Sequence, residues 1–225
     1  MIAILDNGMG NLFSIYNGLK RVCNSAVLVS GVSGSGLGLR EAEGVVVPGV
    51  GAFDDGIRKL KPFVEALLEV VDSGVPVLGI CIGMQVLFEE SEERREERRE
   101  ERSEERSEEG KEGGEAGLGL IPGRVVRLPA SVRVPHIGWN NLHLRPESRS
   151  ELLDGISDAD YFYFVHSYYC VPRDEETVVA TVEYGVQLAA VVKKENIYGV
   201  QFHPEKSSKK GLRVLSNFVK MCTLG

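Results

Sequence analysis

The amino-terminal half alternates short apolar runs with segments in which apolar residues recur every three to four positions, and this alternation is the strongest constraint on the fold. Residues 12–22 and 63–71 have the helical spacing. The apolar runs that indicate strands are residues 1–5, 26–29, 45–47 and 75–80. Strands that alternate with helices predict a mainly parallel sheet with helices on both faces.

The carboxy-terminal half has a different pattern of apolar residues. Short apolar or alternating runs, separated by turn residues, predict additional antiparallel strands. These runs are residues 125–128, 139–144, 161–165, 178–182, 186–192 and 197–202. A final amphipathic helix is expected from about residue 209 to 221. Because no Pro/Ser-rich linker divides the halves, we expect residues 1–225 to form a single α/β domain.

Most of the net negative charge lies in one segment. Residues 89–109 hold twelve Glu and six Arg, a net charge of −6 out of −7 for the whole chain. The four-residue repeat in this segment has no apolar face to bury, so we expect residues 91–116 to be a solvated, low-complexity insertion. The nearly neutral remainder has no basic stripe for nucleic acid.

The chain also lacks the usual signs of a membrane or secreted protein. No apolar run approaches the roughly 18 residues that a membrane-spanning helix needs. The first residues do not form a secretory signal, so we expect a cytoplasmic location. The four cysteines are spread out with no CxxC pair, and His136 and His143 have no metal-ligand spacing. We therefore expect no metal and no cofactor.

The most informative string runs from Val75 to Gln85. An expected strand leads into Gly79-Ile-Cys81-Ile-Gly83, and a helical pattern follows. This is the layout of a nucleophile elbow with Cys in place of Ser. A thiol at a helix N-terminus is favoured as thiolate, and the free N–H groups there can hold an oxyanion. The alternative is a buried cysteine that acts as a small hydrophobe.

A second string, Tyr198-Gly-Val-Gln-Phe-His203-Pro-Glu205, ends an expected strand. If the chain stays extended, His203 and Glu205 project to the same side, where the carboxylate can orient the imidazole and stabilise its cation. The alternative is a surface histidine beside a proline turn. A cysteine, a histidine and a carboxylate brought together would imply acyl transfer through a thioester.

The strings around Cys81 and His203 resemble the two signatures of the class I, triad-type glutamine amidotransferases. This resemblance implies a three-layer, flavodoxin-like α/β fold with a mainly parallel central sheet and added antiparallel strands. Other segments resemble the branch of the family that supplies ammonia to a cyclase in histidine biosynthesis. These segments are residues 6–11, 48–53, 135–140, 164–168 and 203–208.

Carried over position by position, the resemblance makes Cys81 the nucleophile, His203 the acid/base and Glu205 its orienting partner. The backbone donors that would hold the oxyanion are those at Gly49, Val50 and Ile82. The positions that match glutamine-binding residues are Gly51, Gln85, Ser167 and Tyr168. Without the resemblance, Gln85 would be interpreted as a helix-surface residue and Tyr168 as a packing residue.

The resemblance also implies a partner, a cyclase subunit with a (β/α)₈ barrel, in a heterodimer. Free ammonia is mostly protonated in neutral water, so it is useful only if a dry path carries it to an acceptor. This chain has no P-loop and no dinucleotide fingerprint with which to bind such an acceptor. The residues that match the interface are Asn11, Trp139, Asn140 and Lys206.

Three other functions stay open at this point. The chain could be the glutaminase subunit of another synthase, such as anthranilate synthase, although residues 48–53 and 135–140 argue against it. It could be a cysteine hydrolase on a similar sheet. It could also be a binding module with a decayed site, which the presence of all three triad residue types disfavours.

Overall fold

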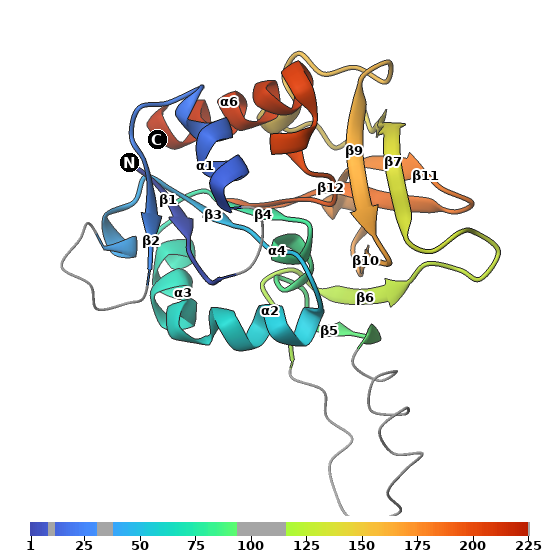
Figure 1. Ribbon diagram of the computed structural model, residues 1–225, viewed down its shortest axis with the longest axis horizontal. Coiled ribbons are helices and arrows are strands. Elements are labelled where there is room, and N and C mark those ends of the chain that lie inside the picture. Colours follow the sequence, from blue (N-terminus) through green and yellow to red (C-terminus); the bar gives the residue numbers. More distant parts are fainter. Residues whose placement is uncertain (9–11, 31–37, 94–115, 225) are drawn as a thin grey trace, which may run out of the picture.

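The computed structural model describes residues 1–8, 12–30, 38–93 and 116–224 (Figure 1). An eight-stranded mixed sheet dominates this part of the chain, in the order β2-β1-β3-β4-β13-β12-β11-β8. Strands β2, β1, β3, β4 and β13 run parallel, and β12, β11 and β8 continue the sheet antiparallel. The expected α/β fold, mainly parallel with added antiparallel strands, is confirmed.

The strands of the large sheet follow the apolar runs of the sequence. Their bounds are β1 Ile2–Leu5, β2 Ala26–Val29, β3 Gly44–Val47, β4 Val77–Ile80, β8 His143–Leu144, β11 Val178–Glu183, β12 Gln187–Lys194 and β13 Ile197–Val200. Every residue of β1, β3, β4 and β13 is buried. Such fully apolar runs are typical of parallel strands covered on both faces.

Helices cover both faces of this sheet. Figure 1 shows α1 (Leu12–Lys20) and α6 (Ser208–Leu224) on one face, and α2 (Phe53–Leu60) and α3 (Val64–Asp72) on the other. Helix α2 was not expected, although Phe53, Ile57 and Leu60 are buried at helical spacing on one side of it. Its Gly and charged residues weaken the pattern in the sequence.

Two smaller sheets lie beside the large one. Strands β10 (Tyr168–Pro172), β6 (Gly123–Arg127) and β5 (Glu90–Ser91) form a three-stranded sheet, and β7 (His136–Asn141) pairs with β9 (Tyr161–His166). The sequence predicted antiparallel strands at β6, β7 and β9. It assigned no strand to β5, which has only two residues, or to β10, which ends in a proline.

The expected charged insertion lies mostly outside the described residues, because these omit 94–115. Its first residues belong to the folded part: Ser91 ends β5, and the backbone N–H of Glu92 donates to the Val125 carbonyl at 2.9 Å. None of the helices in the described ranges has the length and apolar character needed to cross a membrane.

The pairing of β4 with β13 sets the position of the candidate site. Gly79 pairs with Gly199 and Ile80 with Val200, so the two parallel strands end side by side. The backbone N–H of Cys81 donates to the Val200 carbonyl at 2.8 Å. Sites in open α/β sheets lie at the carboxyl ends of the strands, and here both expected catalytic strings leave the sheet at that edge.

Candidate active site

Cys81 lies at the sharp turn between β4 and α4 (Ile82–Gln85). Its backbone φ is 55° and its ψ is −112°, a conformation that costs a non-glycine residue on the order of 1–3 kcal/mol and that is concentrated at functional sites. The Cys81 carbonyl accepts hydrogen bonds from the N–H groups of Met84 (3.0 Å) and Gln85 (3.1 Å), which starts the helix directly after the cysteine. The structure therefore has the strand, turn and helix of a nucleophile elbow.

The Cys81 side chain is 4% exposed. Besides its interaction with His203, described below, two polar groups from the described residues contact its sulfur. The thiol donates to the carbonyl oxygen of Val165 on β9 at 3.9 Å, and Nε2 of Gln201 donates to the sulfur at 3.7 Å. Because a thiolate can only accept, the Gln201 contact favours the charged form and the Val165 contact favours the neutral thiol.

The loop after β3, residues 48–51, packs tightly against the start of α4. A Cβ atom at Gly49 would lie 2.6 Å from the backbone nitrogen of Gly83 and 2.7 Å from Cβ of Ile82. A Cβ atom at Gly83 would overlap the carbonyl oxygen of Val47. Only glycine permits this approach. The two expected oxyanion donors, at Gly49 and Ile82, are therefore in close contact at the first turn of α4. N–H groups in the first turn of a helix have no intrahelical partners.

His203 and Glu205 form a buried pair. Nδ1 of His203 lies 2.9 Å from Oε1 of Glu205, and the two side chains are 2% and 1% exposed. The sequence argument placed His203 and Glu205 on the same side only if the chain stayed extended, and residues Pro204–Lys206 instead form a 3₁₀ turn. The hydroxyl of Ser207 donates to the His203 carbonyl at 2.6 Å and so closes the turn. The carboxylate therefore reaches the imidazole through the turn and not along a strand.

The environment of His203 favours its cation. Burial lowers the pKa of His203, but hydrogen bonding and charge interaction with Cys81 and Glu205 outweigh burial and raise it to about 9. Nδ1 is engaged by Glu205, so Nε2 is the nitrogen left for the sulfur. In the described part of the chain, Nε2 is buried and forms no hydrogen bond of ordinary geometry. Catalytic hydrogen bonds are often long before substrate binds.

The structure brings two of the four candidate glutamine-binding residues together. Gln85 is 1% exposed, so it does not lie on the helix surface. Its Nε2 donates to the Tyr168 carbonyl at 3.1 Å, whereas its Oε1 is buried and unpartnered within the described ranges. Ser167 is half-buried next to Tyr168. Gly51 and Val50 lie in the loop after β3, Gly51 with a φ of 101° and Val50 40% exposed.

Sequence reasoning missed three buried polar residues near these groups. Gln201, two positions before His203, contacts both Cys81 and Gln85. His136 and His166 form a hydrogen-bonded pair, with Nδ1 of His136 3.0 Å from Nε2 of His166. The sequence offers a weak signal for Gln201, a polar residue at the end of a run that is otherwise apolar. It offers none for the histidine pair, because 30 residues separate its members.

Among the candidate interface residues, Trp139 and Lys206 are exposed, and Lys206 follows Glu205 directly in the 3₁₀ turn. Trp139 is 52% exposed, with its ring edge-on to Tyr163 at 6.0 Å. Nζ of Lys206 lies 5.8 Å from the centre of the same Tyr163 ring, so Tyr163 connects these two candidates. Asn140 donates from Nδ2 to a backbone carbonyl of β11 at 2.9 Å. Asn11 lies outside the described residues.

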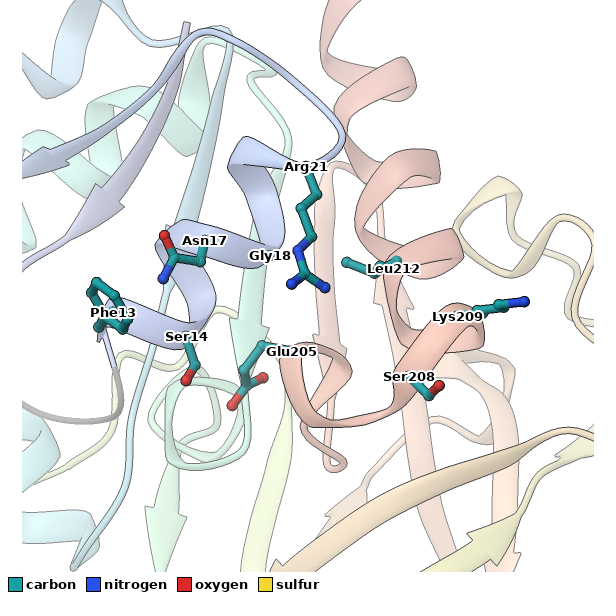
Figure 2. Close-up of a pocket in the computed structure, with 9 residues that line it drawn as sticks. All are labelled: Phe13, Ser14, Asn17, Gly18, Arg21, Glu205, Ser208, Lys209 and Leu212. Atoms are coloured by element: carbon teal, nitrogen blue, oxygen red, sulfur yellow. The ribbon is translucent and has the colours of Figure 1, made fainter.

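A cavity of about 330 Å³ lies between α1 and the start of α6. Figure 2 shows Glu205 at its wall, with Ser14 of α1 and Arg21, which follows α1, opposite Lys209 of α6. The lining includes Glu205 but neither Cys81 nor His203. The cavity therefore adjoins the carboxylate end of the triad and is separate from the nucleophile.

In the part of the chain that the structure describes, no group of three His, Cys, Asp or Glu residues could hold a metal ion.

Comparisons with known proteins agree with this geometry. The family model described as "Glutamine amidotransferase class-I" matches residues 3–222. The Moorella thermoacetica protein named "Imidazole glycerol phosphate synthase subunit HisH" is 48% identical over 220 residues, which are 96% of this chain and 93% of the relative. The Methanothermobacter thermautotrophicus protein of the same name is 44% identical over 98% of both chains. The name belongs to the branch that the sequence resemblance indicated, so that prediction is confirmed.

Solved structures with much lower identity share the fold. The structure of PurLQS from Thermotoga maritima has a TM-score of 0.70 at 16% identity and covers 97% of each chain. The glutaminase domain of CTPS from Trypanosoma brucei has a TM-score of 0.64 at 15% identity, covering 99% of this chain and 93% of that one. Given the family match over nearly its whole length and relatives of one name above 40% identity, the chain belongs to the class-I glutamine amidotransferases, in the branch of the imidazole glycerol phosphate synthase HisH subunits.

Proposed function

We propose that this chain is the glutaminase subunit of an imidazole glycerol phosphate synthase: it hydrolyses glutamine to glutamate and ammonia and passes the ammonia to a cyclase subunit. The observation that carries this proposal is the environment of His203. Its ring lies between a thiol on a strained turn and a buried carboxylate, and both raise its pKa. A base oriented in this way is what a cysteine nucleophile needs.

The first half of the reaction forms a thioester. The Cys81 thiolate attacks the side-chain amide carbon of glutamine, a carbon–sulfur bond forms, and the carbonyl electron pair moves onto oxygen. The N–H groups of Ile82 and of the loop at Gly49 and Val50 stabilise this oxyanion. When the intermediate collapses, the carbon–nitrogen bond breaks, and His203 donates its Nε2 proton to the departing nitrogen, which leaves as ammonia.

The second half restores the enzyme. His203, now neutral, takes a proton from water at Nε2, and the hydroxide attacks the thioester carbon. The carbon–sulfur bond breaks, which releases glutamate and regenerates the Cys81 thiolate beside the imidazolium. Throughout, Glu205 holds the Nδ1 proton and stabilises the cation.

Gln85, Tyr168, Ser167 and Gly51 are proposed to hold the glutamine. The support for Gln85 is its buried Oε1, which lacks a partner within the described part of the chain and can accept a hydrogen bond from a substrate amide or amine. Its Nε2 is already committed to the Tyr168 carbonyl, which fixes the side chain in this orientation. Buried groups paired in this way discriminate strongly against substrates that lack the matching polar atom.

The proposed partner is a (β/α)₈-barrel cyclase, and the proposed docking surface includes Trp139, Asn140, Lys206 and Asn11. The relatives' shared name calls each of them one subunit of a synthase. The exposed Trp139 and its neighbour Tyr163 are aromatic residues of the kind that anchor interfaces, and the Lys206 ammonium lies over the same Tyr163 ring. We place this activity in the cytoplasm, where free cysteines such as Cys81 stay reduced.

Replacing the nucleophile tests the chemistry. Cys81→Ala should abolish glutamine hydrolysis, whereas ammonia supplied to the complex should still support synthesis by the cyclase. Cys23→Ala, which changes a cysteine remote from the triad, is the matched control and should retain activity. Glutaminase activity of Cys81→Ala near that of the wild type would refute the assignment.

The partnership is tested by measuring glutaminase activity with and without the cyclase and its ligand. We expect stimulation of the wild type. Trp139→Ala should lose stimulation while its activity without the cyclase stays unchanged, since Trp139 is 52% exposed and its ring contacts Tyr163. Equal stimulation of both proteins would remove Trp139 from the proposed surface.

A further inference from the structure

Gln201 lies where the two catalytic strands end together. It directly follows β13, whose last residue, Val200, pairs with Ile80 of β4. Its backbone N–H donates to the Ala190 carbonyl at 2.9 Å, and the residue is 0% exposed. A buried amide must find hydrogen-bond partners, because leaving its polar atoms unsatisfied costs about 1–3 kcal/mol. Its partners therefore show what the side chain does.

Both ends of the Gln201 amide contact groups of the candidate site. Nε2 donates to the Cys81 sulfur at 3.7 Å, and Oε1 accepts from Nε2 of Gln85 at 3.2 Å. The orientation of the two amides follows from the backbone. The Tyr168 carbonyl can only accept, so Gln85 must present its NH₂ group there. Gln201 then faces that same NH₂ group and must offer its oxygen, which turns its own NH₂ toward the sulfur.

We propose that Gln201 is a positioning residue that ties the nucleophile to the glutamine-binding side chain: its NH₂ group stabilises the Cys81 thiolate, and its oxygen holds Gln85 in register with that sulfur. The proposal rests on the proposed function, because it takes Cys81 as the nucleophile and Gln85 as a substrate ligand. It assigns a role to a residue for which the sequence motifs gave none.

Gln201 is the side chain that donates to the sulfur without being titratable itself. The titratable groups on the neighbouring elements are His203 and Glu205 after β13, Cys170 on β10 and His166 on β9. The amide of Gln201 donates to the sulfur at every pH. Its loss should therefore move the pH range in which Cys81 is reactive, with the titratable groups still in place.

Two variants separate the two bonds. Gln201→Met fills a similar volume and removes both the donor to the sulfur and the acceptor for Gln85. Gln201→Glu keeps an oxygen for Gln85 but replaces the donor with a negatively charged oxygen beside the sulfur. The buried amide of Asn217 offers a matched control, because its Nδ2 donates to the Leu152 and Asp154 carbonyls, away from the triad. Asn217→Leu removes a comparable buried amide.

The experiment measures alkylation of Cys81 by iodoacetamide in the full chain from pH 5 to 9, with the modified peptide quantified by mass spectrometry. At pH 7 we expect alkylation of Gln201→Met to slow roughly fivefold to tenfold, the loss typical of one hydrogen bond, and its half-maximal pH to rise. Gln201→Glu should slow more, and Asn217→Leu should follow the wild type. Alkylation of both Gln201 variants at the wild-type rate throughout, in protein that still unfolds cooperatively, would overturn the proposal.

Glutaminase kinetics test the second bond. Gln201→Glu should keep the KM for glutamine within about twofold of the wild type, whereas Gln201→Met should raise it several-fold because Gln85 loses one of its anchors. A wild-type KM in Gln201→Met would overturn the link to Gln85.

The alkylation experiment does not depend on glutamine turnover, so failure of the proposed function and failure of the role of Gln201 can be told apart. A wild type without glutaminase activity defeats the proposed function, whereas an active wild type with unchanged variants defeats only the role of Gln201.

Discussion

Two buried histidine sites in this protein have opposite charge preferences. His203, His136 and His166 are 2%, 3% and 6% exposed, so none of the three is open to solvent. Yet the pKa of His203 is raised to about 9, whereas burial lowers the pKa of His136 to about 4 and that of His166 to about 3. The difference is that His203 has a carboxylate and a thiol for partners, whereas the other two have each other. Partners, and not burial, decide which imidazole carries charge.

The neutral pair has one consistent arrangement of protons. The Tyr168 carbonyl accepts from Nδ1 of His166 at 2.9 Å, so Nε2 of this neutral ring is an acceptor. That Nε2 accepts the Nδ1 proton of His136. The rings of Phe164 and Tyr184 stack on His136 with centroids 5.1 and 3.9 Å away. The neutral His166 ring can donate a hydrogen bond to the Tyr168 carbonyl, which also accepts from Gln85. Because this ring is fixed in one neutral state, it cannot shuttle protons.

The largest expected effect removes the partner that makes His203 different. Glu205→Gln keeps the shape of the side chain but loses the charge, so the imidazolium is no longer stabilised or held in one tautomer. We expect kcat for glutamine hydrolysis to fall about 10³- to 10⁴-fold. NMR titration of the His203 ring should show a lower pKa. A variant with full activity would mean that Cys81 alone sets the charge of His203.

The second prediction removes a member of the neutral pair. His166→Leu removes one of the donors to the Tyr168 carbonyl and takes the acceptor away from Nδ1 of His136, and this should lower the free energy of unfolding by about 1–3 kcal/mol. Denaturant unfolding measures that loss. Catalysis should suffer far less than in Glu205→Gln, with the main change in KM, because Gln85 still donates to the same carbonyl. A loss of kcat equal to that of Glu205→Gln would show that the pair takes part in the chemistry.

The two sites should also appear as separate limbs in the pH dependence of stability. The folded pKa of His203 is above the unfolded value of 6.5, so the folded state holds the extra proton between pH 6.5 and 9, and stability falls as pH rises through that range. The folded pKa values of His136 and His166 are below 6.5, so the unfolded state takes up protons there, and stability falls as pH drops from 6.5 toward 4. Each slope is at most about 1.4 kcal/mol per pH unit per histidine.

Urea unfolding at a series of pH values checks this prediction. His203→Gln should flatten the limb from pH 6.5 to 8, and His166→Phe the limb from pH 6.5 to 4.5. Outside these windows other groups contribute: burial raises the pKa values of Cys170 and Cys222, and carboxylates such as Glu151 titrate at lower pH. If either variant flattened the other limb, the assignment of charge to the two sites would be reversed.

The smallest effect is expected from the segment that has many charges and no apolar residue. Deleting residues 94–109 removes only Arg, Glu and Ser, so it takes nothing from the hydrophobic core. The midpoint of thermal unfolding and the basal glutaminase rate should both stay close to those of the full chain. Loss of cooperative unfolding in the deletion would show that this segment packs against the domain.

The sequence predicted best what depends on local chemistry. The apolar runs located β1 to β4 and β13, and the turns at Cys81 and Pro204 indicated where the chain leaves the sheet. Pairs of residues distant in sequence could not be found in this way. The contact between Gln201 and Cys81 spans 120 residues and exists only because β13 inserts beside β4.

The elements that were missed share a physical reason. Helix α2 has the buried residues Phe53, Ile57 and Leu60 but also a glycine and several charges, so its pattern is weak in isolation. Gln85 is polar and lies on a one-turn helix, which suggests exposure, but the side chain is buried and the carbonyl of Tyr168 on β10 receives its amide. Tertiary packing overrides local preference at both places.

The position of β13 in the sheet has a consequence for the order of events during synthesis. The ribosome completes β4 and Cys81 long before it adds the strand that brings in Gln201 and, two positions later, the imidazole, because 120 residues separate Cys81 from Gln201. Until that strand slides between β4 and β12, the nascent chain has a sulfur with no base and no amide beside it. Under the proposed mechanism an unfinished copy cannot hydrolyse glutamine, because the last strand of the sheet to be made is the one that completes the site.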